Sequence, residues 1–136
     1  MGNVITLSIF ESKWMPNSRL KLHIRILLED EIAFGPGKAD LLEAIQRTGS
    51  ISQAAKSMNM SYRRAWQLVE TMNQSFQSSL VETQTGGTHG GGAVVTEFGH
   101  HILNKFREME KTAMSSIAHE FEQISTQLKN SNKPQE

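Results

Sequence analysis

Residues 50–66 read SISQAAKSMNMSYRRAW and contain the signals of two short helices joined by a tight turn. Ala54 and Ala55 are small enough to let two helices cross closely. Asn59 tolerates the positive φ that a tight turn requires, and Met60 places an apolar side chain just after it. This combination predicts a helix-turn-helix.

Capping residues divide the surrounding sequence into helices. Gly49 suits the left-handed position just after a helix. Ser50 and Gln53 have the spacing of a capping box, and Ser61 can cap the helix that follows it. Three helices are therefore predicted over residues 38–48, 51–58 and 62–76.

The third helix has one apolar face and one polar face. Its inward positions are predicted to be Ala65, Leu68, Val69 and Met72, and Trp66 is expected to belong to the core because tryptophan is usually mostly buried. The polar positions near its start are Ser61, Tyr62, Arg63, Arg64 and Gln67. Arginine can read guanine and glutamine can read adenine from the major groove, so these five residues are predicted to contact DNA. A helical hairpin without any DNA partner is the alternative.

A glycine-rich hairpin follows the third helix. Residues 80–85 and 93–95 are predicted strands, joined by a loop that contains five glycines. Thr88, His89, Gly90 and Gly91 are predicted to approach the DNA backbone. A phosphate-binding loop of the P-loop type does not fit, because no lysine follows the glycines and a strand comes next.

The two ends of the chain carry simpler patterns. Residues 20–28 alternate between apolar and polar side chains, which predicts a half-buried strand, with a short return strand at 32–34. Residues 97–128 have apolar positions at steps of three and four, which predicts one long helix opened by a Thr96 cap. The expected division is a weakly structured segment 1–18, a domain 19–110, a helical continuation 111–128 and a disordered tail 129–136.

Composition narrows the function classes. The chain has 136 residues, zero formal net charge and no cysteine, which excludes disulfides and thiolate metal sites. Residues 47–107 contain six basic and three acidic side chains, a local net charge of +3 that favours a nucleic-acid partner. No segment has the length of a membrane span or the pattern of a secretory signal, so a cytoplasmic location is expected.

The sequence offers little evidence for a metal site or a catalytic site. His100 and His101 are adjacent, and His119 has no second histidine at ligand spacing on its helix face. We expect no metal site, no cofactor and no catalytic residues. The function class that the sequence favours is therefore a DNA-binding regulator. The alternatives are a protein-interaction module that uses the long helix without DNA, and an enzyme.

The fold class predicted is α+β and mostly helical: a winged helix-turn-helix with a small antiparallel sheet and a long C-terminal helix. That helix exposes an apolar stripe that is predicted to pair two copies of the chain as a homodimer. The predicted interface residues are Ile117, Phe121, Ile124 and Leu128. The alternative is that residues 1–18 fold back over the stripe.

Three segments together resemble a known family. They are residues 48–55 (TGSISQAA), residues 60–66 (MSYRRAW) with Met72-Asn73, and residues 85–87 (TGG) with 90–96 (GGGAVVT). The combination, over about residues 20–110, is similar to the N-terminal domain of the ModE family of molybdenum-responsive transcriptional regulators. The resemblance implies a dimeric winged-helix domain that binds double-stranded DNA. Full-length members carry further C-terminal domains that bind molybdate, and this sequence resembles a stand-alone DNA-binding member without them. A small-molecule effector is therefore not expected for this chain.

Overall fold

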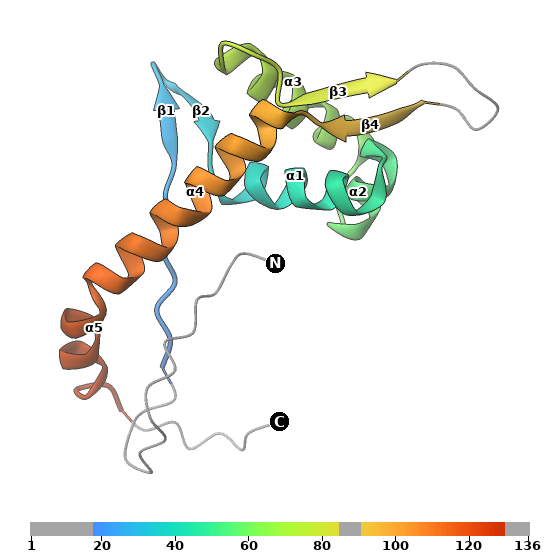
Figure 1. Ribbon diagram of the computed structural model, residues 1–136. Coiled ribbons are helices and arrows are strands. Elements are labelled where there is room, and N and C mark those ends of the chain that lie inside the picture. Colours follow the sequence, from blue (N-terminus) through green and yellow to red (C-terminus); the bar gives the residue numbers. More distant parts are fainter. Residues whose placement is uncertain (1–17, 85–90, 130–136) are drawn as a thin grey trace. The chain divides into compact units, whose positions relative to one another are not determined.

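A computed structural model describes residues 18–84 and 91–129 of the chain. These residues form two compact units. The first unit comprises residues 23–107, and the second comprises residues 18–22 together with residues 108–129. Figure 1 shows the elements of both. In chain order they are β1 (Ile26–Leu28), β2 (Glu31–Phe34), α1 (Pro36–Thr48), α2 (Ile51–Ser57), α3 (Tyr62–Ser75), β3 (Val81–Gln84), β4 (Gly92–Val95), α4 (Glu97–Ser116) and α5 (Ala118–Ser125).

The core of the first unit lies among α1, α2 and α3. Leu41, Leu42 and Ile45 of α1 are fully buried. Ala54 and Ala55 of α2 are buried as well, and their small side chains permit the close crossing expected from the sequence. The inward positions of α3 are also confirmed: Ala65, Val69 and Met72 are buried, and Leu68 packs partly buried against them.

The turns between these helices follow the capping signals. Gly49 has φ 72° and Asn59 has φ 55°, so both adopt the predicted left-handed conformation. Ser50 accepts a hydrogen bond from the Gln53 amide at 3.2 Å, and Ser61 accepts one from the Arg64 amide at 3.0 Å. Only half of the capping box forms, because the Ser50 amide donates to the Thr48 hydroxyl, 3.4 Å away.

The hairpin after α3 is a wing of two antiparallel strands. β3 pairs with β4 in a regular register from Val81 opposite Val95 to Gln84 opposite Gly92. Thr96 then caps α4, accepting a hydrogen bond from the Gly99 amide at 2.9 Å. The predicted α+β class and winged helix-turn-helix arrangement are both confirmed.

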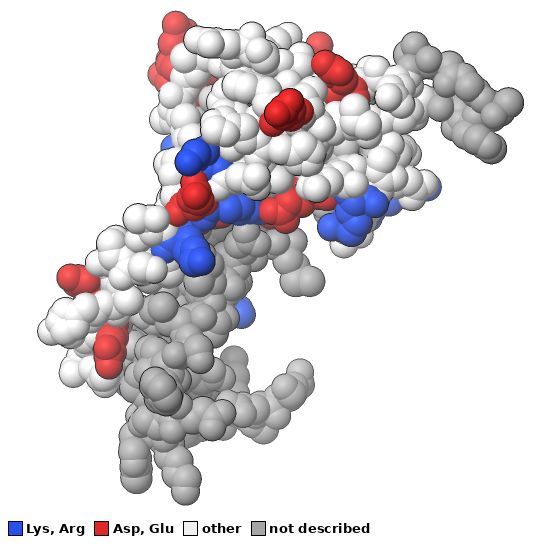
Figure 2. All heavy atoms as spheres, in the orientation of Figure 1, with Lys and Arg blue, Asp and Glu red and all other residues white. Residues whose placement is uncertain are grey.

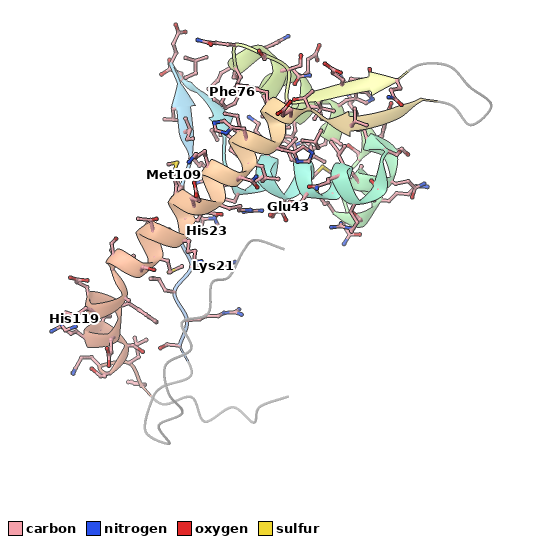
Figure 3. All side chains as sticks on the ribbon, viewed as in Figure 1. Lys21, His23, Glu43, Phe76, Met109 and His119 are labelled. Atoms are coloured by element: carbon pink, nitrogen blue, oxygen red, sulfur yellow. The ribbon has the colours of Figure 1, made fainter. Side chains whose placement is uncertain are left out.

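Four phenylalanines close the core beside α4. Phe34 of β2 contacts Phe76 and Phe106 edge-on, with ring centroids 6.1 and 5.0 Å apart, and Phe76 contacts Phe98 at 6.2 Å. Figure 3 labels Phe76 at the end of α3. Because these rings come from β2, the end of α3 and α4, they fix α3 to elements at both ends of the first unit.

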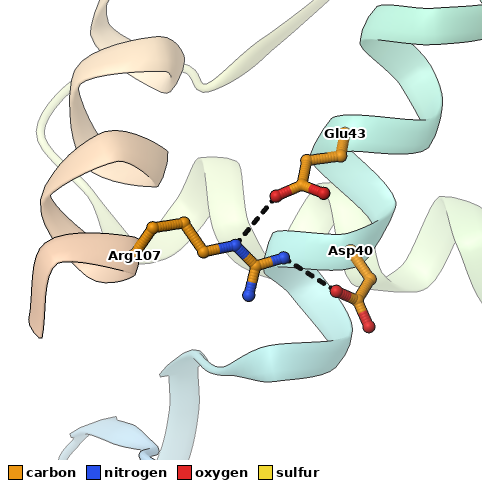
Figure 4. A network of polar contacts seen from close by, with 3 residues as sticks. All are labelled: Asp40, Glu43 and Arg107. Carbon is orange, nitrogen blue, oxygen red and sulfur yellow. Dashed lines mark hydrogen bonds and ion pairs between the residues drawn. The ribbon is translucent and has the colours of Figure 1, made fainter. Parts of the chain in front are cut away.

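An ion-pair network ties the same part of α4 to α1. The guanidinium of Arg107 donates to Asp40 Oδ1 and to Glu43 Oε1, each at 2.8 Å, as Figure 4 shows. The side chains of Arg107 and Asp40 are mostly buried, whereas that of Glu43 is 43% exposed. The Asp40 bond is therefore the better shielded from water.

The predicted strand at 20–28 is wrong for most of its length. Only Ile26–Leu28 form a strand, and all three side chains are exposed. Exposure does alternate along residues 20–25, but there is no ladder, because β2 is four residues long and pairs only with β1. Gly35 and Pro36 then begin α1, so β2 cannot extend to pair with residues 20–25.

The single long helix predicted at 97–128 is also wrong. It is broken at Ile117, whose φ of −109° and ψ of 8° are not helical, and a new helix begins at Ala118. Ser115 and Ser116 precede the break, and the Ser116 hydroxyl donates to the Ala113 carbonyl at 2.8 Å. Such local hydrogen bonding competes with the helical ladder, which explains why the apolar periodicity alone predicted too long a helix.

Candidate nucleic-acid interface

The polar face of α3 is open to solvent. Tyr62, Arg63, Arg64 and Gln67 are all exposed, as the sequence predicted. Ser61 is exposed too, although its oxygen already caps the helix. The side chains of Arg63, Arg64 and Gln67 therefore face solvent near the start of a helix whose opposite face is packed in the core. That is the geometry needed to reach base edges in the major groove.

Trp66 was predicted to belong to the core, and this is wrong. Its side chain is 36% exposed and lies on the solvent side of α3, one turn after Tyr62. The two rings meet edge-on with centroids 6.1 Å apart. Ala65 and Val69 supply the buried face instead, because the helical period carries position 66 out of the core.

The wing is positioned by hydrogen bonds from two different helical regions. The Ala93 amide of β4 donates to the Gly49 carbonyl at 2.9 Å, which attaches the wing to the α1–α2 turn. The Asn73 side chain of α3 accepts from the Leu80 amide at 2.8 Å and donates to the Val81 carbonyl at 3.0 Å. The wing and α3 are thus held in a defined relation to one another.

Of the predicted wing contacts, Thr88, His89 and Gly90 lie outside the described residues. Gly91 is described and exposed. A Cβ at Gly91 would lie 2.6 Å from the Gln84 carbonyl oxygen, closer than real Cβ atoms approach. Glycine is therefore required where the returning strand begins.

Basic side chains gather on the first unit. Arg47 at the end of α1, Lys56 at the end of α2, and Arg63 and Arg64 on α3 are all exposed. Figure 2 shows blue basic spheres where α2 lies in Figure 1. Arg47 and Lys56 lie in the last turns of their helices, where the carbonyl dipoles favour a positive charge, so they are compatible with stable helices as well as with an anionic partner.

Lys38 is the exception, since it is buried at the start of α1. Its ammonium donates to the Ile32 carbonyl. Burial lowers the pKa of Lys38 below 10.5, the positive charge of Arg64 lowers it further, and Glu31 raises it. Arg64 on α3 therefore repels the Lys38 ammonium, which is bonded to the Ile32 carbonyl of β2.

The described residues offer no support for a metal site or a membrane span. Within residues 18–84 and 91–129, no group of three or more histidines and acidic residues has the geometry of a metal site. His119 is exposed on α5 (Figure 3). Among the helices described, none is long and apolar enough to cross a membrane.

The predicted dimer residues lie in the second unit. Ile117, Ile124 and Leu128 are 37%, 65% and 48% exposed, and Phe121 is half-buried. The alternative cover by the N-terminal segment has one contact in its favour, because the hydroxyls of Ser18 and Ser125 are hydrogen-bonded to each other. Met114 of α4 and Ser125 of α5 are buried, so their positions on these helices are not open to a second copy of the chain.

Residues 38–100 match the family model described as bacterial regulatory helix-turn-helix protein, lysR family. This match spans α2, α3, β3 and β4 and the greater part of α1.

The resemblance to the ModE regulators is confirmed by pairwise similarity. The chain is 37% identical over 98 residues to transcriptional regulator ModE of Haemophilus influenzae, covering 72% of this chain and 38% of the relative. It is 37% identical over 95 residues to molybdenum transport protein ModE of Azotobacter vinelandii, covering 68% and 35%. It is 43% identical over 76 residues to molybdenum-pterin-binding protein MopA of Rhodobacter capsulatus, covering 56% and 29%. The chain thus matches about a third of the length of each of these relatives.

Among solved structures, the CbnR_DBD–DNA complex is similar, with a TM-score of 0.48 and 20% sequence identity. The match covers 62% of this chain and 91% of that chain.

Sequence reasoning missed one feature of the interface. A hollow of about 270 Å³ lies between the start of α2, the exposed side of α3 and the wing. Trp66, Thr83 and Gln84 line it, and none of the three was predicted as a site residue. The signal available was the position of Trp66 four residues after the exposed Tyr62, which places both on one face of α3.

Proposed function

We propose that this protein binds double-stranded DNA through its winged helix-turn-helix and regulates transcription. The observation that carries the proposal is the anchored helix α3 with Arg63, Arg64 and Gln67 exposed near its start. Arg63 and Arg64 reach base edges in the major groove, Gln67 adds a further polar contact, and Ser61 and Tyr62 lie at the edge of the groove. The names of the ModE relatives, which are those of regulators rather than enzymes, support the same class.

The wing supplies contacts to the DNA backbone in this proposal. The proposed contacts are Thr88, His89, Gly90 and Gly91, because the glycines around them let the backbone come close to phosphates. Such contacts position the protein without specifying sequence. Genes concerned with molybdenum are the proposed targets, since two of the relatives, the molybdenum transport protein ModE and the molybdenum-pterin-binding protein MopA, are named for that metal.

A homodimer is the proposed binding species. Helix-turn-helix proteins that act as dimers place two recognition helices about 34–36 Å apart, one DNA turn, and so read two half-sites. Ile117, Ile124 and Leu128 offer exposed apolar side chains for pairing, and Phe121 adjoins them. We further propose a cytoplasmic location, no catalytic activity and no small-molecule effector.

The second candidate is a protein-interaction module that uses α4 and α5 without DNA, and the same exposed apolar residues favour it. Fluorescence anisotropy with labelled duplexes distinguishes the two. For the regulator, affinity falls as salt rises, because Lys and Arg side chains displace counterions from the phosphates. The Arg63→Ala, Arg64→Ala double variant, with an unchanged melting temperature, should lose most of the binding. Absence of any salt-dependent binding to genomic duplex fragments would remove the regulator and leave the second candidate.

A further inference from the structure

Two large aromatic side chains on α3 are exposed without any role in the core. Tyr62 is 53% exposed and Trp66 is 36% exposed. Their rings contact each other edge-on, with an interplanar angle of 87°. A tryptophan is costly to leave in water, and a pair of exposed aromatics beside a concave surface is typical of a binding site.

The α3–wing hollow is that concave surface. Besides Tyr62 and Trp66 it is lined by Ser52 of α2, Thr83 and Gln84 of β3, and Gly92 of β4. Its walls are fixed in place, because Gln84 and Gly92 are paired in the wing register and the next residue of β4, Ala93, is hydrogen-bonded to Gly49. The hollow therefore exists before any partner binds.

Its chemistry is aromatic and neutral. Among the described residues, none that lines the hollow carries a charge. The side chains of Ser52, Thr83 and Gln84 are exposed and make no hydrogen bond within the described part of the chain. A site of this kind suits a ligand with an uncharged ring-like body and acceptor oxygens at its edge.

We propose that the hollow receives one deoxyribose and its adjoining phosphate from the DNA strand that borders the major groove. Tyr62 and Trp66 pack against the sugar, and the hydroxyls of Ser52 and Thr83 with the amide of Gln84 donate to phosphate oxygens, as neutral side chains commonly do at DNA backbones. This inference rests on the proposed function: with α3 in the groove, the bordering strand passes between α3 and the wing. The hollow then sets the register of the protein on DNA and does not read sequence.

The first test compares Trp66→Ala with Trp66→Phe and, as a matched control, Leu28→Ala on the exposed face of β1. We expect Trp66→Ala to weaken binding by roughly 5- to 20-fold, from the loss of apolar burial. The loss should be equal for a specific duplex and a random one, and the salt slope should be unchanged, whereas Arg63→Ala should lower the slope by about one. Trp66→Phe should recover most of the affinity, and Leu28→Ala should bind as the wild type.

The second test keeps Trp66 in place. Trp14→Phe leaves Trp66 as the only tryptophan, and saturating duplex should shift and quench its emission as the ring leaves water. The Thr83→Ala, Gln84→Ala double variant should bind both duplexes more weakly than the wild type. It replaces Trp66→Ala in the test if that variant does not fold. Unchanged emission at saturation, or wild-type affinity in a folded Trp66→Ala variant, overturns the inference while DNA binding stands. If the wild type binds no duplex, the proposed function itself fails.

Discussion

Asn73 of α3 is bonded to both backbone groups of Val81 in the wing. Its amide nitrogen donates to the Val81 carbonyl at 3.0 Å, and its Oδ1 accepts from the Val81 amide at 3.3 Å and from the Leu80 amide at 2.8 Å. One side chain thus joins the end of the recognition helix to the first strand of the wing. It replaces the hydrogen bonds that a neighbouring strand would otherwise supply to β3.

Replacing Asn73 by alanine should therefore destabilise the fold. The variant leaves backbone groups of Leu80 and Val81 without their partner, which costs about 1–3 kcal/mol in the free energy of unfolding. Urea denaturation measures this, with Asn104→Ala on the exposed side of α4 as the control, expected within about 0.5 kcal/mol of the wild type. Equal stabilities for the two variants would contradict the bracing role of Asn73.

Two glycine substitutions should have opposite effects. A Cβ at Gly99 would lie 2.3 Å from the Leu80 carbonyl oxygen and 2.9 Å from Val95 Cγ1, so Gly99→Ala should cost at least about 2 kcal/mol. A Cβ at Gly37 in α1 meets nothing within 4 Å, so Gly37→Ala should stabilise by roughly 0.4–1 kcal/mol. Thermal unfolding of both variants checks the pair. A Gly99→Ala protein as stable as the wild type would show that α4 is not packed this closely on Leu80 and Val95.

Arg63 and Arg64 should carry sequence preference. Removing a base-reading arginine costs about 1–3 kcal/mol in binding and relaxes preference at one base position. Binding selections on randomised duplexes, run with Arg63→Ala and Arg64→Ala separately, measure both quantities. Arg25→Ala, which removes an equal charge before β1, serves as the control. If both recognition-helix variants fold and keep the wild-type preference, neither arginine reads a base.

Lys38 should make stability depend on alkaline pH. Because burial lowers its pKa in the folded state below the 10.5 of the unfolded chain, folding favours the neutral amine. The stabilising effect of this preference is fully present above pH 10.5 and is lost as the pH falls towards the folded pKa. The free energy of unfolding of the wild type, relative to Lys38→Met, should therefore rise as pH increases from 7 to 10.

Denaturant titrations at several pH values give that difference, and Lys56→Met controls for the removal of one surface charge. If the difference in the free energy of unfolding between the wild type and Lys38→Met stays constant across the pH range, the ammonium of Lys38 is hydrated in the folded protein.

Pairing through the second unit should be sensitive to charge. Ile124 and Leu128 are exposed within one chain, so Ile124→Glu with Leu128→Glu spares the fold of the monomer while placing charges in the proposed interface. Light scattering should give a dimer mass for the wild type and a monomer mass for the double variant. Gln123→Glu, an exposed polar position on α5, should remain dimeric. A monomeric wild type at tens of micromolar would remove the dimer, and a dimeric double variant would move the interface elsewhere.

The sequence by itself determined the local structure around the recognition helix. The caps at Ser50 and Ser61 and the left-handed turns at Gly49 and Asn59 are chemical properties of single residues, and they formed as predicted. Helical periodicity also placed Ala65, Val69 and Met72 correctly, since spacing alone decides which residues share a face. The free positions of Arg63 and Arg64 followed from the same rule.

The tertiary structure decided what lies against those elements. Residues 20–25 have the alternation of a strand, but only a neighbouring strand can supply a ladder, and β2 is too short to do so. Trp66 has the size of a core residue, but the core was already filled by smaller side chains of α3. The hollow beside Trp66 likewise depends on segments distant in sequence, which no local pattern encodes. The break at Ile117 has a local cause, the Ser116 hydroxyl bonded to the Ala113 carbonyl, but apolar periodicity does not register such a bond.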